Sequence, residues 1–378
     1  MKEKIGIFIN CHSSYGGAER RFYRAFSMLK NHENIYLIAN NRTIENLSAN
    51  DSDEESVSKD KFIIMPGGIK KSGLAYKSWH LINSLLLVFY VIKQKIRHIH
   101  YPVDPSFYTL FHYFILTRLG ISYSVSVVDS SRTSLSDFSK IRYFVWRITL
   151  KNADRIDYLS ESIKDSINRL FPSLCGSSSV SPCSFTNYER AIFSKDKIYD
   201  LVMLSRFVSK KGHVYLIDGL KALASEGVVG RLQVGLFGDG PDLNYIKDIT
   251  NGIEDFDFHF GQIDDVFEIL SKSRILLSLQ RDENYPSQAV LEAYASGAIC
   301  ILTDVGESYK LVPEKGGGFL VPRDDPTALA SCIKLAIHRS KSIDPLIQYH
   351  IARKFVRERH SIEVFNEYLT DFLSRCLR

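Results

Sequence analysis

Residues 200–212 read DLVMLSRFVSKKG, and this stretch decides the fold. Its apolar residues Leu201 to Leu204 predict a short buried strand, and the loop that follows contains Arg206, Lys211 and a glycine. A strand, a loop and a helix in this order are typical of α/β domains with a parallel sheet, in which ligands bind at the carboxyl ends of the strands. The stretch therefore predicts the first strand and a ligand-binding loop of such a domain.

The same alternation continues on both sides of this stretch. Strand-like runs follow near 232–237, 256–260, 274–280, 298–303 and 318–322, and others precede it at 4–10, 34–40, 61–66, 97–102, 122–129 and 155–160. Segment 171–199 has two prolines and little helical periodicity, so we place the linker there. A length of 378 residues also favours two domains.

We therefore predict an α/β fold of two Rossmann-like, doubly wound domains that face each other across a cleft. The predicted domains span residues 1–185 and 186–350. The charged helical segment over 351–378 is expected to pack on the outside or to cross back to the first domain.

Composition indicates a folded chain, with 45% hydrophobic and 24% charged residues. The six cysteines form no C-x-x-C pair, so we expect reduced thiols and no metal site. The N-terminus lacks the length and the cleavage site of a signal peptide. These features predict a cytoplasmic protein.

The longest apolar stretch, residues 81–92, is too short to span a bilayer, which needs about 20 residues, and is expected to form a buried helix. Residues 1–196 contain 26 Lys and Arg against 18 Asp and Glu. With the aromatic, basic stretches 107–118 and 140–147, this excess suggests peripheral attachment to an anionic membrane, at the inner face of the plasma membrane. The alternative is that Phe107, Phe111 and Phe114, at i, i+4 and i+7, are core residues of an ordinary helix.

Two loops offer positive groups or bare backbone to an anion. Gly16 and Gly17 join the first strand to its helix, where a phosphate could approach the N–H groups, although a tight turn alone would also need glycine. Arg206 and Lys211 lie five residues apart and could clamp a diphosphate, or could be solvated charges. Nucleic acid is a less suitable partner, because the basic residues are dispersed and no stacking motif is present.

Two further strand ends carry candidate binding groups. Gly238 lies in a glycine turn that is compatible with a ligand. Residues 282–293 leave a strand and open a helix, whose first N–H groups near Ser287, Gln288 and Ala289 could bind phosphate. Glu292 falls in an apolar part of that helix, so its carboxylate needs partners, either sugar hydroxyls or a nearby Arg or backbone amides.

In their order along the chain these motifs resemble the retaining glycosyltransferases of family 4, which have the GT-B architecture. The segments that carry the resemblance are Gly16 to Arg20, Arg206 with Lys211-Gly212, Gly238 to Pro241, Asn284 to Glu292, and Thr303 to Glu307. Each is weak alone, and together they cover most of the chain.

The resemblance implies a role for each matching residue. Arg206 and Lys211 hold the donor diphosphate, Glu292 bonds the nucleotide ribose, and Gly16-Gly17 contacts donor phosphate. The backbone of Gly261, Gln262 and Ile263 contacts the base. No metal or other cofactor is required, because the cations and two helix ends neutralise the phosphates.

Two positions depart from the family pattern. Asn284 stands where the family usually has a glutamate, with Glu283 beside it. Asn284 can form hydrogen bonds to a sugar or phosphate but carries no charge. Asp129 follows a strand where many relatives have a histidine, and is expected either to contact the sugar or to form a turn. We take Arg206, Lys211, Asn284 and Asp129 as the catalytic candidates.

The resemblance implies a retaining hexosyltransferase that moves a sugar from a nucleotide diphosphate sugar to a saccharide or lipid-linked acceptor. Surface polysaccharide or glycolipid synthesis is the expected context. Two alternatives remain open at this point: a nucleotide-sugar epimerase of the same architecture, and a non-catalytic sugar-binding protein.

Overall fold

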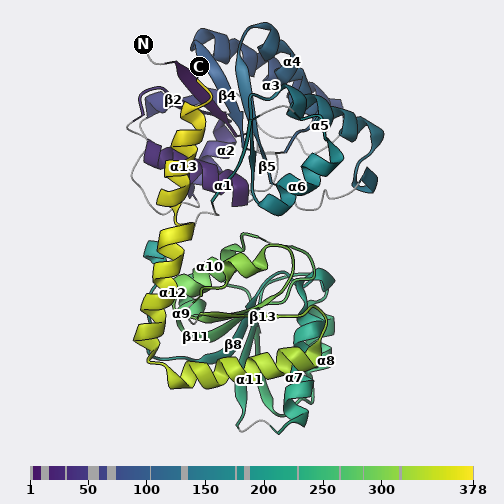
Figure 1. Ribbon diagram of the computed structural model, residues 1–378, viewed down its shortest axis with the longest axis vertical. Helices are drawn as coiled ribbons and strands as arrows, with labels where there is room; N and C mark the ends of the chain where they lie inside the picture. The colour runs from purple at the N-terminus through teal and green to yellow at the C-terminus, as the bar shows by residue number, and fades with distance from the viewer. Residues whose placement is uncertain are drawn as a thin grey trace. The chain divides into compact units, whose positions relative to one another are not determined.

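The computed structural model describes residues 3–9, 17–29, 32–49, 59–65, 74–102, 104–128, 135–174, 177–182, 188–227, 230–263, 265–283, 285–314 and 317–377. The chain divides into two compact units, Met1–Cys183 with Ile362–Arg378, and Ser184–Ser361. Figure 1 shows that each unit is built on its own parallel sheet, with helices around it. The prediction of two Rossmann-like α/β domains is confirmed.

Among the residues that the structure describes, the sheet of the first unit has seven parallel strands in the order β3-β2-β1-β4-β5-β6-β7. These strands are β1 (Lys4–Phe8), β2 (Ile35–Asn40), β3 (Phe62–Met65), β4 (Ile96–Tyr101), β5 (Ser122–Val127), β6 (Arg155–Tyr158) and β7 (Ser177–Val180). The last strand lies inside the segment that we predicted to be linker. Its sequence is SSSV, and it pairs only with β6 at the sheet edge, so it shows no apolar alternation.

Helices cover both faces of this sheet (Figure 1). They are α1 (Gly17–Met28), α2 (Asn41–Ala49), α3 (Leu74–Lys93), α4 (Phe107–Arg118), α5 (Lys140–Asn152), α6 (Glu161–Leu170) and α13 (Ile362–Ser374). One apolar core joins α1 and α13 to the sheet, and the other lies under α3, α4, α5 and α6. The side chains of Phe22, Ala25 and Phe26 on α1 are buried, as is that of Leu29 directly after the helix.

The C-terminal segment is not the single helix predicted over 351–378. It is divided at Ser361: α12 (Pro345–His360) belongs to the second unit, and α13 belongs to the first. Buried polar contacts hold α13 in place, since Tyr368 donates a hydrogen bond to Asp157 on β6 at 2.6 Å. Ser126 on β5 donates to the other carboxylate oxygen at 2.7 Å. Burial raises the pKa of Asp157, and these donors and the charge of Arg21 oppose that rise.

In the described part of the second unit, six parallel strands follow the order β10-β9-β8-β11-β12-β13. These are β8 (Tyr199–Leu204), β9 (Leu232–Phe237), β10 (Phe256–Gly261), β11 (Ser273–Ser278), β12 (Ile299–Thr303) and β13 (Gly318–Val321). The helices are α7 (His213–Ser225), α8 (Leu243–Thr250), α9 (Val266–Ser271), α10 (Gln288–Ala295), α11 (Pro326–Ser342) and α12. Each face of the sheet has its own apolar core.

No described helix is both long enough and apolar enough to cross a bilayer. The expectation that residues 81–92 form a buried helix holds for only one side of that helix. This stretch lies in α3, which buries Leu87 and Val91 but leaves Ile82, Leu85 and Phe89 more than half exposed. The helix is apolar on its outer side as well as on its inner side.

Candidate functional site

The candidate site lies at the carboxyl edge of the second unit's sheet. β8 is central, with β9 on one side and β11 on the other, so the chain reverses its direction of winding between β8 and β11. In open α/β sheets this reversal leaves a crevice at the carboxyl ends of the two strands, where ligands bind. The loops after β8 and β11 therefore define the centre of the site.

The loop after β8 places Lys211 directly against the loop after β11. The Lys211 ammonium donates a hydrogen bond to Gln280 Oε1 at 2.6 Å. The backbone N–H of Arg281 donates to the Lys210 carbonyl at 3.0 Å, which joins the two loops a second time. Gly212 makes this approach feasible, since it has φ 84°, and a Cβ there would lie 2.0 Å from the Leu279 carbonyl oxygen. Only glycine fits both constraints.

The Lys211 ammonium is held in a partly dehydrated position. Burial lowers the pKa of Lys211, the neighbouring Lys210 lowers it further, and Asp282 raises it. Gln280 is neutral, so its hydrogen bond orients the ammonium without neutralising it. A bound anion would supply the negative charge that neutralises the Lys211 ammonium.

Arg206 lies at the beginning of the loop after β8, which also carries Lys211. The side chain is exposed, and among the described residues it forms no ion pair. Its backbone is fixed by the turn after β9, because Gly238 and Gly240 pack against the flanking carbonyls. A Cβ on Gly238 would lie 2.1 Å from the Ser205 oxygen, and one on Gly240 would lie 2.3 Å from the Phe207 oxygen. The turn therefore has a structural role in supporting the Arg206 loop.

Behind Lys211, the loop is packed on an aromatic pair. The buried ring of Phe207 stacks on His213, the first residue of α7, with centroids 4.3 Å apart. Burial, assisted by the charge of Lys211, lowers the pKa of His213 to about 4. His213 is therefore neutral near pH 7 and adds no charge to the site.

On the β11 side of the site, α10 begins at the carboxyl edge of the sheet. Ser287 is its N-cap, and its side chain makes no capping hydrogen bond. Glu292, one turn along the helix, is half-buried and accepts a hydrogen bond from the Gln288 side chain at 2.8 Å. The helix start and the Glu292 carboxylate thus lie one turn apart.

Glu283, the neighbour of Asn284, is used in packing the loop after β12. Its carboxylate accepts a hydrogen bond from the Glu307 N–H at 3.2 Å. Gly306, with φ 54°, allows the two chains to meet, since a Cβ there would lie 2.4 Å from the Glu283 carboxyl carbon. Glu307 itself is buried and paired with Lys310 at 3.0 Å.

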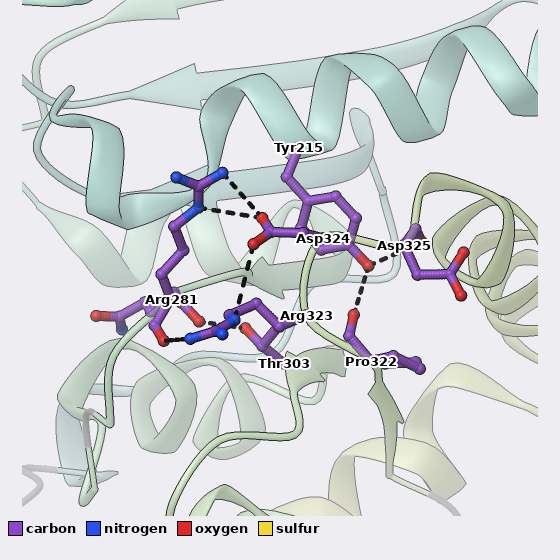
Figure 2. Close-up of polar contacts among 8 residues, drawn as sticks. Tyr215, Arg281, Thr303, Pro322, Arg323, Asp324 and Asp325 are labelled. Atoms are coloured by element: carbon purple, nitrogen blue, oxygen red, sulfur yellow. Dashed lines mark hydrogen bonds and ion pairs between the residues drawn. The ribbon is translucent and has the colours of Figure 1, made fainter.

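A polar network fixes the outer side of the loop after β11 (Figure 2). The Arg281 guanidinium binds Asp324, after β13, with Nε 3.1 Å from Oδ1. The Thr303 hydroxyl, at the end of β12, donates to the Gln280 carbonyl at 2.8 Å. Tyr215 on α7 donates to the Pro322 carbonyl at 2.8 Å. The loops after β11 and β13 are therefore tied to each other, to the end of β12 and to α7, around the segment that positions Gln280.

The structure brings most of the predicted residues to this one edge. They are Arg206, Lys211, Gly238, Gly261, Gln262, Ile263, Ser287, Gln288, Ala289 and Glu292, which follow β8, β9, β10 and β11. Gly261 to Ile263 follow the edge strand β10, two strands from β8. Gly17 begins α1 in the first unit. Gly16, Asp129 and Asn284 lie outside the described residues.

Sequence reasoning missed Gln280 and His213. Gln280 could have been noticed as an amide directly after a strand, but its partner Lys211 is 69 residues away. His213 was indistinguishable from an ordinary helix residue. In the described part of the chain, no three His, Cys, Asp or Glu side chains are grouped to bind a metal ion.

Comparison with known proteins finds sequence similarity in the second unit. Residues 199–339 match the family model described as Glycosyl transferases group 1. N-acetyl-α-D-glucosaminyl L-malate synthase from Bacillus anthracis is 34% identical over 144 residues, which are 38% of this chain and 36% of that protein. The chain thus aligns with about a third of that relative's length.

Solved structures match both units. A glycosyltransferase from Rickettsia africae has a TM-score of 0.74 at 14% identity, over 100% of this chain and 99% of its own. Anabaena HepE, in complex with UDP, has a TM-score of 0.74 at 14% identity over 98% of this chain and 100% of its own. Sucrose-phosphate synthase from Thermosynechococcus elongatus has 0.69 at 18%, over 99% of each chain. Residues 199–339 are therefore similar to the glycosyl transferases of group 1, and the two units have the fold of these solved structures, the GT-B fold.

Proposed function

We propose that this protein is a retaining hexosyltransferase that moves a sugar from a nucleotide diphosphate sugar to an acceptor hydroxyl. The observation that carries the proposal is the Lys211 ammonium, which is half-buried at the crevice and is bonded to neutral Gln280. Arg206 is exposed on the same loop, without an ionic partner among the described residues. Two cations in this position suit a diphosphate.

The remaining groups at the edge suit the rest of a donor. We assign binding of the ribose hydroxyls to Glu292 and binding of the base to Gly261–Ile263. The N–H groups from Ser287 to Ala289 are assigned to the donor phosphates, together with the two cations. Donor binding is thus assigned to the second unit and acceptor binding to the first. Gly16-Gly17, Asp129 and Asn284 keep their predicted roles toward donor phosphate and sugar.

The proposed reaction breaks the bond between the anomeric carbon and the diphosphate oxygen. The acceptor oxygen bonds to the anomeric carbon on the same face, and its proton passes to the departing phosphate. Arg206 and Lys211 stabilise the charge that develops on the diphosphate. Loss of one such preorganised group typically costs about 3 kcal/mol in the transition state. No step in this scheme requires a metal ion.

The relatives guide the choice of donor and acceptor. HepE was determined with UDP, and the Bacillus anthracis relative is named for transfer of N-acetylglucosamine to L-malate. We therefore propose a UDP-sugar as the first donor to test, with GDP- and ADP-sugars next. A saccharide or lipid-linked acceptor, in surface polysaccharide or glycolipid synthesis, is the proposed context.

The test compares Lys211→Met with Lys210→Met, which removes the same charge from the adjacent, exposed position. Donor hydrolysis without acceptor and UDP affinity by calorimetry are measured for both. We expect Lys211→Met to lose on the order of 100-fold in kcat/KM and Lys210→Met to remain near the unaltered protein. Equal losses in the two variants would exclude the Lys211 site.

The same labelled-donor incubation separates the two alternatives. Conversion of the donor to an isomeric sugar indicates an epimerase, and saturable binding without turnover indicates a non-catalytic protein. Slow release of the nucleoside diphosphate with the sugar indicates the transferase.

A further inference from the structure

The outer surface of α3, α4 and α5 has an unusual composition. These helices lie side by side in the first unit (Figure 1). Their sequences contain seven Lys and Arg residues and no Asp or Glu. The helices on the opposite face, α1, α2 and α13, contain four Arg residues against five acidic residues. The positive charge of the first unit is therefore concentrated on one face.

The basic side chains of this face are not neutralised. Those described are exposed, and none forms an ion pair with a described acidic side chain; they are Lys93, Arg118, Lys140, Arg142, Arg147 and Lys151. Two of them lie over exposed aromatic rings: Arg118 is 4.2 Å from the ring centroid of Phe114, and Lys93 is 5.9 Å from that of Phe89.

The same surface exposes large apolar side chains. Ten of the twenty large hydrophobic residues that are exposed in the described chain lie between residues 82 and 144. On α3 they are Ile82, Leu85, Phe89 and Ile92, at i, i+3, i+7 and i+10, with exposures of 53–57%. Phe111 (40%) and Phe114 (57%) continue the surface on α4, and Ile141 (67%) and Phe144 (57%) on α5. The alternative that Phe107, Phe111 and Phe114 are core residues is therefore wrong for Phe111 and Phe114, and the side chain of Phe107 lies outside the described residues.

We propose that this α3–α4–α5 surface, defined by these apolar and basic residues, docks the protein on an anionic lipid bilayer. Contiguous exposed apolar side chains mark an interaction site. Apolar side chains with cations between them suit the headgroup boundary, where rings enter the acyl region and cations meet acidic lipids. A second copy suits the surface poorly, because a symmetric contact would oppose two sets of unpaired cations. The contact is peripheral, and it does not depend on sugar transfer.

Vesicle sedimentation of the full chain tests the proposal. The vesicles are phosphatidylcholine alone, or phosphatidylcholine with about 30% phosphatidylglycerol, at about 0.05 M and 0.5 M salt. We expect binding to the anionic vesicles at low salt, reduced by on the order of tenfold or more at high salt. Equal sedimentation with both compositions, or none with either, would overturn the proposal.

Variants localise the contact. Phe89→Ser, Phe114→Ser and Phe144→Ser together remove exposed rings, so binding should fall about tenfold or more while the melting temperature is retained.

The matched control combines Tyr245→Ser, Leu335→Ser and Ile347→Ser, side chains of the second unit with exposures of 55%, 59% and 55%. This control should bind as the unaltered protein does. An equal loss of vesicle binding in both triple variants would refute the proposal. It would also be refuted if the protein bound no vesicles but formed dimers that the α3–α4–α5 substitutions dissociate. Donor hydrolysis, measured without vesicles, should be the same in all these variants, so the result is independent of the proposed enzymatic function.

Discussion

Replacing Gly212 with alanine tests whether the close contact of two loops holds the candidate phosphate site together. Gly212 has φ 84°, and a Cβ there would lie 2.0 Å from the Leu279 carbonyl oxygen. Gly252 provides a matched control in the same unit, because it has φ 82° and no heavy atom within 4 Å of the added Cβ. The two substitutions share the backbone strain and differ in the steric overlap.

The expected costs follow from these contacts. A left-handed conformation costs an L-residue roughly 1–2 kcal/mol, which is the full effect expected for Gly252→Ala. Gly212→Ala must also separate the loops. That movement breaks the Lys211 hydrogen bond to Gln280, a charged donor worth about 1.5–3 kcal/mol, and the backbone bond from Arg281 to Lys210, worth about 1 kcal/mol. We expect roughly 3.5–6 kcal/mol in total.

Calorimetric melting and UDP titration measure the two consequences. For a domain of this size, 1 kcal/mol shifts the melting temperature by about 2–4 °C, so Gly212→Ala should lower the melting temperature of the second unit by roughly 7 °C or more. It should also weaken UDP binding, because Lys211 loses its position, whereas Gly252→Ala should leave UDP affinity unchanged. Equal destabilisation by the two substitutions, with UDP affinity retained in both, would refute the reasoning.

Arg206→Ala and Glu292→Ala should each lower kcat/KM for the donor without changing the melting temperature. For Arg206→Ala we expect a loss on the order of 100-fold. An unchanged kcat/KM in either variant would remove that residue from the site. Burial lowers the pKa of Lys211 from the usual 10.5, and a bound diphosphate favours the ammonium. UDP affinity should therefore be highest below the pKa of Lys211 in the unliganded protein, and it should decrease as the pH rises through that pKa. Titrations of UDP between about pH 7 and 10 measure this dependence. Lys211→Met should make UDP affinity nearly independent of pH over the same range. Tyr368→Phe removes a donor from buried Asp157 and should destabilise the first unit by about 1–3 kcal/mol in denaturant unfolding; retention of full stability would show that α13 does not depend on this contact.

The alternation of strands and helices could be read from the sequence because it is a local property. Strands such as 232–237 are short apolar runs between polar loops, and the structure has β9 over the same residues. The parallel arrangement then follows from the connections, and it places the strand-end loops at one edge. Most candidate residues therefore lie at one edge of the second unit.

The structure differs from the expectations where a local sequence pattern is compatible with two different structures. Residues 81–92 are apolar on all sides, so periodicity could not tell which side packs on the sheet. The break at Ser361 lies within a continuous helical pattern, and Tyr368 finds Asp157 across 211 residues. Such pairings depend on tertiary contacts.

The sequence by itself determined two doubly wound α/β units and the loops that carry Arg206, Lys211 and Glu292, because hydrophobic period and glycine positions act within a few residues of one another. Only the tertiary structure decided that Lys211 is oriented by Gln280 and that an apolar, basic face of α3, α4 and α5 is left exposed. The Lys211–Gln280 contact and the exposed face both depend on which distant segments of the chain come into contact. Packing of the helices and loops on the sheets determines those contacts.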